Sequence, residues 1–198
     1  MSAWSKGLLC IMQRYIIHLE NVKYISREAN WLLKTARSLV SDIGVIVRDT
    51  RVASRHVEFD TSVPENISME EVLRRFATIS PISEYEHLVE KRMGKHEAIL
   101  KAKDLFNDEK YWGAHEALES VWKNTHHEER DLLNGIILIA AAFVHDQKDE
   151  YSICIAILSR AMEKLSQAKG LYFEMDLDEI KKRVLRIIET GKIERFTI

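Results

Sequence analysis

Three side chains near the middle of the chain have the types and the spacing of metal ligands. His115 and Glu119 are four residues apart, and Glu116 directly follows His115. Residues i and i+4 share one face of a helix, so an imidazole and a carboxylate at this spacing can chelate one divalent ion. A ligand from the next helix, for which His145 is the candidate, would complete a catalytic centre with an open position. The pattern thus indicates a metal-assisted hydrolase as one function.

The same residues also fit a structural role. Residues 111–122 have helical periodicity, with His115 inside the apolar stripe and Glu119 at its edge. The connection to the next apolar segment is short, which predicts an antiparallel neighbouring helix. Counted from that turn, Glu119 is level with Asn134, whereas His145 lies about two helical turns too far. A buried polar core of His115, Glu119 and Asn134, with a hydrogen bond from Asn134 to Glu119, is therefore the favoured interpretation.

The pattern around these residues resembles that of a known family. It comprises Phe106-Asn107, Tyr111, Ala114-His115-Glu116, Leu118-Glu119, Trp122, Leu133-Asn134-Gly135, Ala140-Ala141-Ala142 and His145. Over about residues 95–190, this set resembles the domain of unknown function 309 family. The resemblance implies a compact all-helical bundle and brings no established activity. The family's usual Gln is replaced by Asn134 and Leu138, and its Gly-Asn by Lys148-Asp149, so the obvious polar partner of His115 is missing.

A second set of residues could bind nucleic acid. Arg48, Arg51 and Arg55 end a stretch, residues 14–55, with eight Lys and Arg side chains and four carboxylates. If these arginines share a sheet face with Tyr15 or Tyr24, they could bind RNA or phosphate. A mixed-charge surface is the favoured alternative, because residues 58–90 are correspondingly acidic.

The segment around residue 58 alternates in polarity. Val57 and Phe59 face one side of a predicted strand, and His56, Glu58 and Asp60 face the other. The polar triplet could serve acid/base chemistry. An exposed sheet face explains it equally well.

Composition excludes several classes of protein. The 198 residues contain 29 Lys and Arg against 31 Asp and Glu, a net charge of −2, so no global attraction to nucleic acid or anionic membrane is expected. Cys10 and Cys154 have no metal-site spacing, and a reducing cytoplasmic setting fits them best. The most apolar run, residues 136–144, is too short to span a bilayer. No phosphate-binding glycine loop, nucleophile elbow or Cys-x-x-Cys pair occurs.

The first half of the chain predicts an α+β domain, residues 1–93. Strands are expected at residues 13–19, 44–49 and 52–60, and helices at 26–41, 68–79 and 83–93. The order β-α-β-β-α implies a small antiparallel sheet backed by helices, like a truncated ferredoxin-like unit. We recognise no family motif in this domain. Residues 1–11 are interpreted as a disordered or non-native start, with Met12 as an alternative initiation site.

Residues 94–198 predict an all-helical bundle of about five helices. Their expected bounds are 95–106, 111–123, 128–146, 150–169 and 178–189. Thr125 with Glu128 predicts a capping box before the third helix, and Gly170 and Gly191 fit helix C-caps. The first two helices look similar to a tetratricopeptide hairpin. Two such hairpins are too few for an open superhelix, which favours a closed bundle.

The favoured function is a non-catalytic binding or interaction module in the cytoplasm. Its expected partner is another protein or a second copy of the chain, and no cofactor is expected. The alternatives are a metal-assisted hydrolase at His115, Glu116 and Glu119, which would require a divalent ion, and an RNA-binding accessory protein that uses Arg48, Arg51 and Arg55.

Overall fold

The computed structural model describes residues 11–89 and 93–198. The chain divides into two compact units, Met1–Glu90 and Lys91–Ile198. The first contains a four-stranded sheet with helices and the second is almost entirely helical, which confirms the predicted fold class. The predictions for residues 1–10, including Cys10, and for residues 90–92 fall outside the described residues.

The N-terminal unit is a complete ferredoxin-like arrangement. Its elements are β1 (Met12–Glu20), the 3-10 turn η1 (Ser26–Glu28), α1 (Ala29–Leu39), β2 (Ile46–Val52), β3 (His56–Pro64), α2 (Met69–Phe76) and β4 (Ile82–His87). The strand order is β2-β3-β1-β4, and every pair is antiparallel. The unit is therefore not truncated, because β4 supplies the last strand beside β1.

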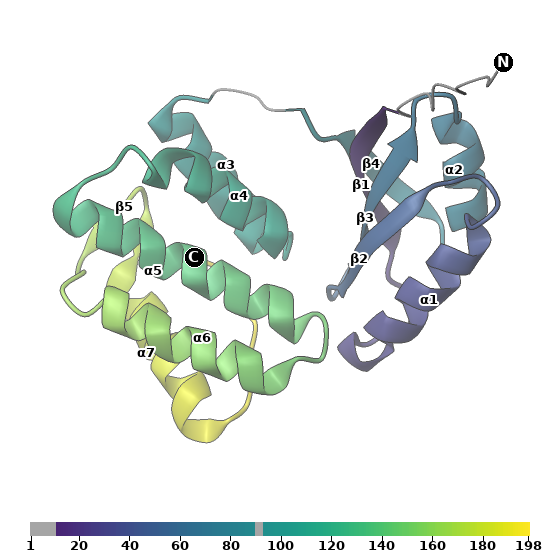
Figure 1. The fold of residues 1–198 in the computed structure, drawn as a ribbon. Coiled ribbons are helices and arrows are strands. Elements are labelled where there is room, and N and C mark those ends of the chain that lie inside the picture. The colour runs from purple at the N-terminus through teal and green to yellow at the C-terminus, as the bar shows by residue number, and fades with distance from the viewer. Residues whose placement is uncertain (1–10, 90–92) are drawn as a thin grey trace, which may run out of the picture. The chain divides into compact units, whose positions relative to one another are not determined.

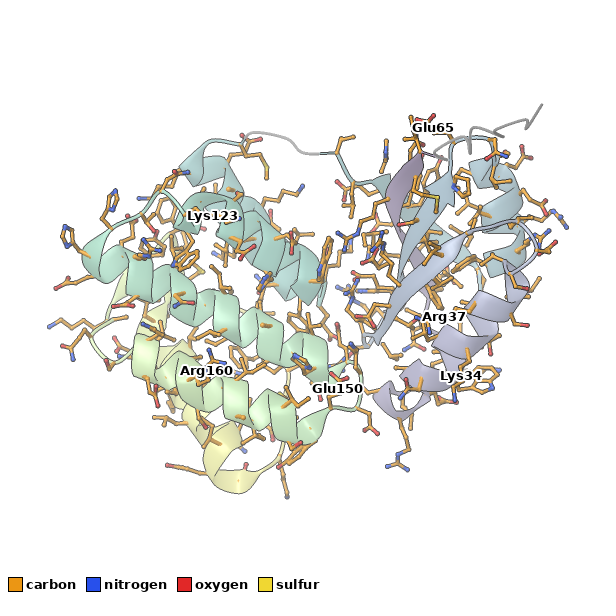
Figure 2. The ribbon with its side chains drawn as sticks, in the orientation of Figure 1. Lys34, Arg37, Glu65, Lys123, Glu150 and Arg160 are labelled. Carbon is orange, nitrogen blue, oxygen red and sulfur yellow. The ribbon has the colours of Figure 1, made fainter. Side chains whose placement is uncertain are left out.

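Helices α1 and α2 cover one face of this sheet (Figure 1). Ile17, Leu19, Val57 and Phe59 point to that face and are fully buried. Burial of each such side chain contributes about 1.5–3 kcal/mol. Arg37 of α1, labelled in Figure 2, donates to the Val47 carbonyl oxygen at 2.9 Å and so ties this helix to the edge strand β2.

The prediction of a helix at residues 83–93 is wrong, because Ile82–His87 forms strand β4. This strand is mostly exposed and contains two carboxylates, Glu84 and Glu86, so the alternating apolar pattern of a strand is weak in its sequence. Its conformation is decided by antiparallel pairing with the edge of β1, in which Glu84 is the register partner of His18.

The hairpin between β2 and β3 turns at residues 53–55 and not at residues 50–51, the gap between the two predicted strands. The Ala53 amide donates to the His56 carbonyl oxygen at 2.9 Å and closes this turn. A register shift between Val47 and Asp49 accommodates Arg48 and lets β2 continue to Val52.

The helical unit contains α3 (Lys95–Asn107), α4 (Tyr111–Trp122), α5 (His127–Asp146), α6 (Tyr151–Lys164) and α7 (Leu177–Thr190). Four of the five helices match the predicted bounds within one residue, but α6 ends five residues early. A short hairpin of β5 (Leu171–Tyr172) and β6 (Met175–Asp176) follows it and was not predicted. Gly170 lies before this hairpin with φ +73°, whereas Gly191 is the predicted left-handed cap of α7.

The core of the helical unit centres on aromatic rings and on α5. Phe106, Tyr111 and Phe143 are buried, with ring centroids 4.9–5.8 Å apart. Helices α5 and α6 pack side by side (Figure 1), and Gly135 permits this approach. A Cβ atom at Gly135 would lie 2.5 Å from Leu165 Cγ.

The start of α5 differs from the predicted capping box. The helix begins at His127, and the Thr125 hydroxyl donates to the Trp122 carbonyl oxygen at 2.8 Å. Thr125 thus closes the end of α4 and does not cap α5. Among the described residues, no helix has the length and apolar character needed to cross a membrane.

Candidate functional site

Helix α4 brings the predicted ligands together. One ligand atom from each of His115, Glu116 and Glu119 lies within 4.8 Å of the others. His115 and Glu119 are partly buried and Glu116 is exposed. The opposite stripe of α4, including Ala114 and Leu118, is buried in the core. The three groups therefore form a cluster at the boundary between core and solvent, which we call the helix cluster.

The helix cluster is not the predicted hydrogen-bonded polar core. Among the described residues, Glu119 and Asn134 make no hydrogen bond with each other, and the His115 Nδ1 atom is buried without a hydrogen-bond partner. Glu119 and Asn134 are both partly exposed, so neither needs a protein partner. A buried ring nitrogen without a partner, in contrast, costs free energy.

His145 does not join the helix cluster. Its Nδ1 atom forms a short hydrogen bond with Glu150 at the turn between α5 and α6, where Glu150 is labelled in Figure 2. The next residue, Asp146, accepts a hydrogen bond from Arg195 at 2.8 Å. This end of α5 therefore contributes to the packing of the C-terminal segment.

A second cluster lies in the N-terminal unit, on the sheet face opposite α1 and α2. His18, His56 and Glu58 each offer one ligand atom within 4.8 Å of the others, and all three are buried. His56 and Glu58 are two residues apart on β3, and His18 of β1 is the register partner of Glu58. The His18 Nε2 and Glu58 Oε2 atoms are 2.9 Å apart. We call this group the sheet cluster.

Arg51 makes Glu58 a permanent carboxylate. Burial by itself raises the pKa of Glu58, but the charge of Arg51 and the hydrogen bond with His18 outweigh this effect and lower the pKa to about 2. The Arg51 Nε atom donates to Glu58 Oε1, and its Nη1 atom lies 3.5 Å from Asp49 Oδ2. The sheet cluster thus contains a negative charge at every physiological pH.

The interpretation of His56, Glu58 and Asp60 as an exposed face is wrong. Their exposed fractions are 8%, 3% and 3%. Asp60 accepts two hydrogen bonds from Arg14, at 2.9 and 2.6 Å. Polarity alternates along β3 as predicted, but ion pairs between strands and not water satisfy the polar side.

The three candidate arginines for RNA have different environments. Arg51 is 2% exposed and bound to Glu58, so it is not positioned to contact an external phosphate. Arg48 and Arg55 are exposed, and Arg48 donates to the Ser62 hydroxyl at 2.7 Å. Tyr15 and Tyr24 pack against the core on the helix side of the sheet. No aromatic ring from this pair therefore accompanies the arginines.

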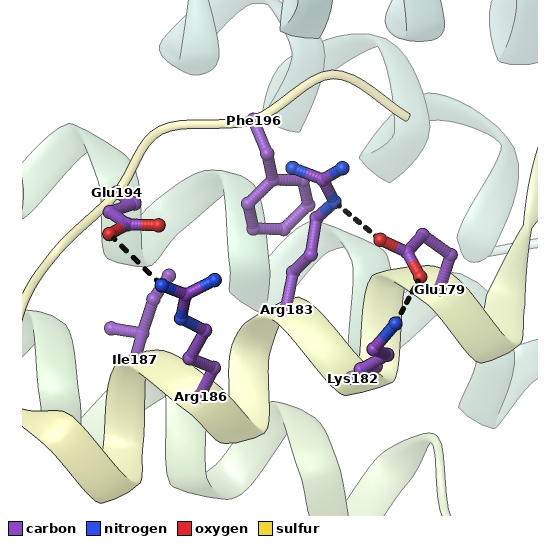
Figure 3. A pocket seen from close by; sticks show the side chains of 7 residues that line it. All are labelled: Glu179, Lys182, Arg183, Arg186, Ile187, Glu194 and Phe196. Carbon is purple, nitrogen blue, oxygen red and sulfur yellow. Dashed lines mark hydrogen bonds and ion pairs between the residues drawn. The ribbon is translucent and has the colours of Figure 1, made fainter.

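The pocket in Figure 3 lies between α7 and the C-terminal segment. This hollow of about 140 Å³ presents Lys182, Arg183 and Arg186. Glu179 pairs with Lys182 and Arg183, and Glu194 lies 3.7 Å from Arg186. Each cation thus has a carboxylate nearby, and only one positive charge of the three is left over, which gives little attraction for an anion.

Sequence reasoning missed His18. The residue lies in an apolar stretch of β1 and is separated from Glu58 by 40 positions. Only the pairing of β1 with β3 brings the two side chains together. The only available signal was the alternation that placed His56 and Glu58 on one face of a strand. It does not say which residue of the neighbouring strand lies beside them.

Comparison with known proteins bears on the helical unit alone. No curated protein matches the chain, and no family model matches the N-terminal unit. The match to a family model covers residues 99–157, which include the helix cluster, Asn134 and His145. Residues 99–157 match the model of a domain of unknown function (DUF309), and this match confirms the family resemblance of the helical unit.

Proposed function

We propose that the helical unit binds a divalent metal ion through the helix cluster and uses it in hydrolysis. The observation that carries this proposal is the convergence of His115, Glu116 and Glu119, whose ligand atoms lie within 4.8 Å of one another. Two of the three side chains, His115 and Glu119, have the i, i+4 spacing of ligands on one helix face.

The unpaired nitrogen of His115 supports this choice over a purely structural role. A polar pair that holds two helices together is expected to be hydrogen-bonded. Here the His115 Nδ1 atom is buried and has no hydrogen-bond partner among residues 11–89 and 93–198. Such a nitrogen could serve as a ligand of a metal ion, and this bond would replace the missing hydrogen bond.

The donor set favours a hydrolytic ion with an accessible coordination shell. One imidazole and two carboxylates suit Zn²⁺, Mn²⁺ or Fe²⁺. Because all three donors come from one helix and Glu116 is exposed, the remaining positions are open to water. A Zn²⁺ ion bound in this way lowers the pKa of its water to about 7 in hydrolytic enzymes.

The proposal is tested by metal titration of the full chain after chelator treatment. Isothermal titration with Zn²⁺ and Mn²⁺ is expected to show a site that is lost in His115→Ala and Glu119→Gln. The matched control is Glu97→Gln, an exposed carboxylate in the first turn of α3, which is expected to bind as the wild type does. Equal binding by all four proteins contradicts the proposal.

The hydrolytic part has its own assay. Turnover of p-nitrophenyl phosphate and p-nitrophenyl acetate by the metal-loaded protein is expected to fall to background in Glu119→Gln. Metal binding without any metal-dependent turnover of either probe would leave a metal-binding protein and remove the hydrolase.

An interaction module is the second candidate function, and exposed apolar side chains favour it. Val22, Ile25 and Trp31 of the N-terminal unit are 67%, 57% and 54% exposed and lie within ten residues of one another. Exposed apolar side chains such as these can form protein contacts when they make a continuous patch. Self-association through them predicts a concentration-dependent mass in light scattering that Trp31→Asp abolishes. A monomer at all concentrations contradicts it.

A cytoplasmic setting belongs to both proposals. Cys154 is a free, buried thiol, and burial raises its pKa to about 12. Such a thiol is inert and suits a reducing compartment.

A further inference from the structure

We propose that the sheet cluster is a second metal site, at which His18, His56 and Glu58 bind a first-row divalent ion such as Zn²⁺. This site belongs to the N-terminal unit and shares no residue with the helix cluster. It stands or falls independently of the proposed function.

The spacing of the donor atoms fits one coordination shell. Bonds of about 2.1 Å at tetrahedral or octahedral angles place neighbouring donors roughly 3.0–3.4 Å apart. His18 Nε2 and Glu58 Oε2 are 2.9 Å apart, and the ring of His56 stands edge-on to that of His18 with centroids 4.9 Å apart. Two imidazoles and one carboxylate form a donor set that selects Zn²⁺, Fe²⁺ or Mn²⁺ over Mg²⁺ and Ca²⁺.

The neighbours of these donors resemble the outer shell of a metal site. Ligating carboxylates are usually hydrogen-bonded through their other oxygen, and ligating histidines usually direct their second nitrogen at a carboxylate. Glu58 meets the first condition, because Arg51 binds its Oε1 atom and leaves Oε2 directed at His18. His18 meets the second, because its Nδ1 atom lies 3.4 Å from Glu84 Oε1.

The contact between His18 and Glu84 is an ion-pair contact without a hydrogen bond. The two atoms are close enough for an ion pair, yet Nδ1 is buried and makes no hydrogen bond within the part of the chain that the structure describes. Glu84 is 53% exposed in its side chain and can move closer. Metal binding at Nε2 fixes the proton of the ring on Nδ1, which turns this loose contact into a charge-assisted hydrogen bond.

The charge of the sheet face also accepts a cation. Register and hydrogen bonding place six carboxylates on this face against three guanidinium groups. The carboxylates are Glu20, Asp49, Glu58, Asp60, Glu84 and Glu86, and the cations are Arg14, Arg48 and Arg51. Carboxylates thus outnumber guanidinium groups on this face, and a bound divalent ion offsets that excess of negative charge.

The test uses the full chain with the helix cluster disabled by His115→Ala and Glu119→Gln. After chelator treatment, this variant is titrated with Co²⁺ and Zn²⁺, and bound metal is counted by equilibrium dialysis and elemental analysis. We expect one ion per chain and visible Co²⁺ absorption bands typical of nitrogen and oxygen ligands. Absence of binding at micromolar metal overturns the proposal.

Variants in the same background assign the ligands. His18→Gln and His56→Gln are expected to weaken Zn²⁺ binding by more than about 100-fold, since even outer-shell changes cost about 10–100-fold. Glu84→Gln, an exposed change that does not threaten the fold, is expected to cost about 10-fold. The matched control is His87→Gln, an exposed histidine of the same sheet that stacks on Tyr15. Unchanged affinity in His18→Gln and His56→Gln overturns the proposal.

A spectroscopic experiment avoids the risk that these glutamine variants unfold. Nitrogen-15 spectra of the histidine rings are expected to shift on Zn²⁺ addition at His18 and His56 and to stay unchanged at His87. Zn²⁺ saturation without a shift at His18 or His56 also overturns the proposal.

Discussion

The two clusters contain similar groups but are built in different ways. The helix cluster uses one helix, and its members are within four residues of one another, at the boundary with solvent. The sheet cluster uses two strands, with His18 and Glu58 40 residues apart; its members are buried, and Glu58 is bonded to Arg51. A cluster of the first kind can lose a member with little harm to the fold, whereas the second kind is part of the fold.

This comparison separates two effects of charge. Ionised groups near the surface remain hydrated and contribute little to stability. Buried ionised groups must be paired, because a charge without a partner has a large desolvation cost. The stability of the two units should therefore respond very differently to changes at their clusters.

The largest expected effect is that of Arg51→Met. The variant leaves the Glu58 carboxylate buried without its cation, and breaking a buried pair in this way costs about 3–5 kcal/mol. Chemical denaturation of wild type and variant measures this difference. The double variant Arg51→Met/Glu58→Met, which removes both charges, should recover much of the loss. Equal stability of wild type and Arg51→Met would show that the sheet cluster does not support the fold.

Acid should destabilise the sheet cluster within a defined range. The pKa of Glu58 is about 2 in the folded protein, against 4.5 for a glutamate without these interactions, so the folded state favours the ionised form. Its contribution is complete above pH 4.5 and is lost as the pH falls from 4.5 through 2, by about 3 kcal/mol in all. The difference in unfolding free energy between wild type and Glu58→Gln should shrink over this range. A constant difference contradicts the cause assigned to the shift.

In the helical unit the largest effect should come from packing and not from charge. Gly135→Ala places a methyl group 2.5 Å from Leu165 Cγ, and overpacking of this kind costs about 1–3 kcal/mol. Thermal unfolding should show the loss, and Leu165→Ala in the same chain should relieve the clash. Gly94→Ala is the control, because no atom of the described residues lies within 4 Å of a Cβ atom there. Comparable effects of the two alanines would mean that α5 and α6 do not approach at Gly135.

The smallest effect is expected at the helix cluster. Glu116→Gln removes an exposed carboxylate that supports no packing, so the unfolding free energy should change by no more than about 0.5 kcal/mol. Chemical denaturation without metal compares this variant directly with Arg51→Met. A loss as large as that of Arg51→Met would erase the distinction between the two clusters.

The sequence predicted the helical unit more fully than the sheet unit, for a physical reason. Helical contacts are local, so the spacing of Tyr111, Ala114 and Leu118 reports both the helix and its buried face. Strand β4 lacked such a pattern, because its conformation comes from pairing with β1. The capping box predicted at Thr125 was wrong for a related reason. The Thr125 hydroxyl can bond to the helix before it as readily as it can cap the helix after it.

For the candidate sites, the same division holds. By itself, the sequence determined the five helices, the family resemblance and the proximity of His115, Glu116 and Glu119, because one helical turn brings those groups together. Only the tertiary structure decided that Asn134 does not bind Glu119, that His145 belongs to another contact, and that His18 joins His56 and Glu58. Those outcomes depend on strand register and helix packing, which bring together residues that no local spacing connects.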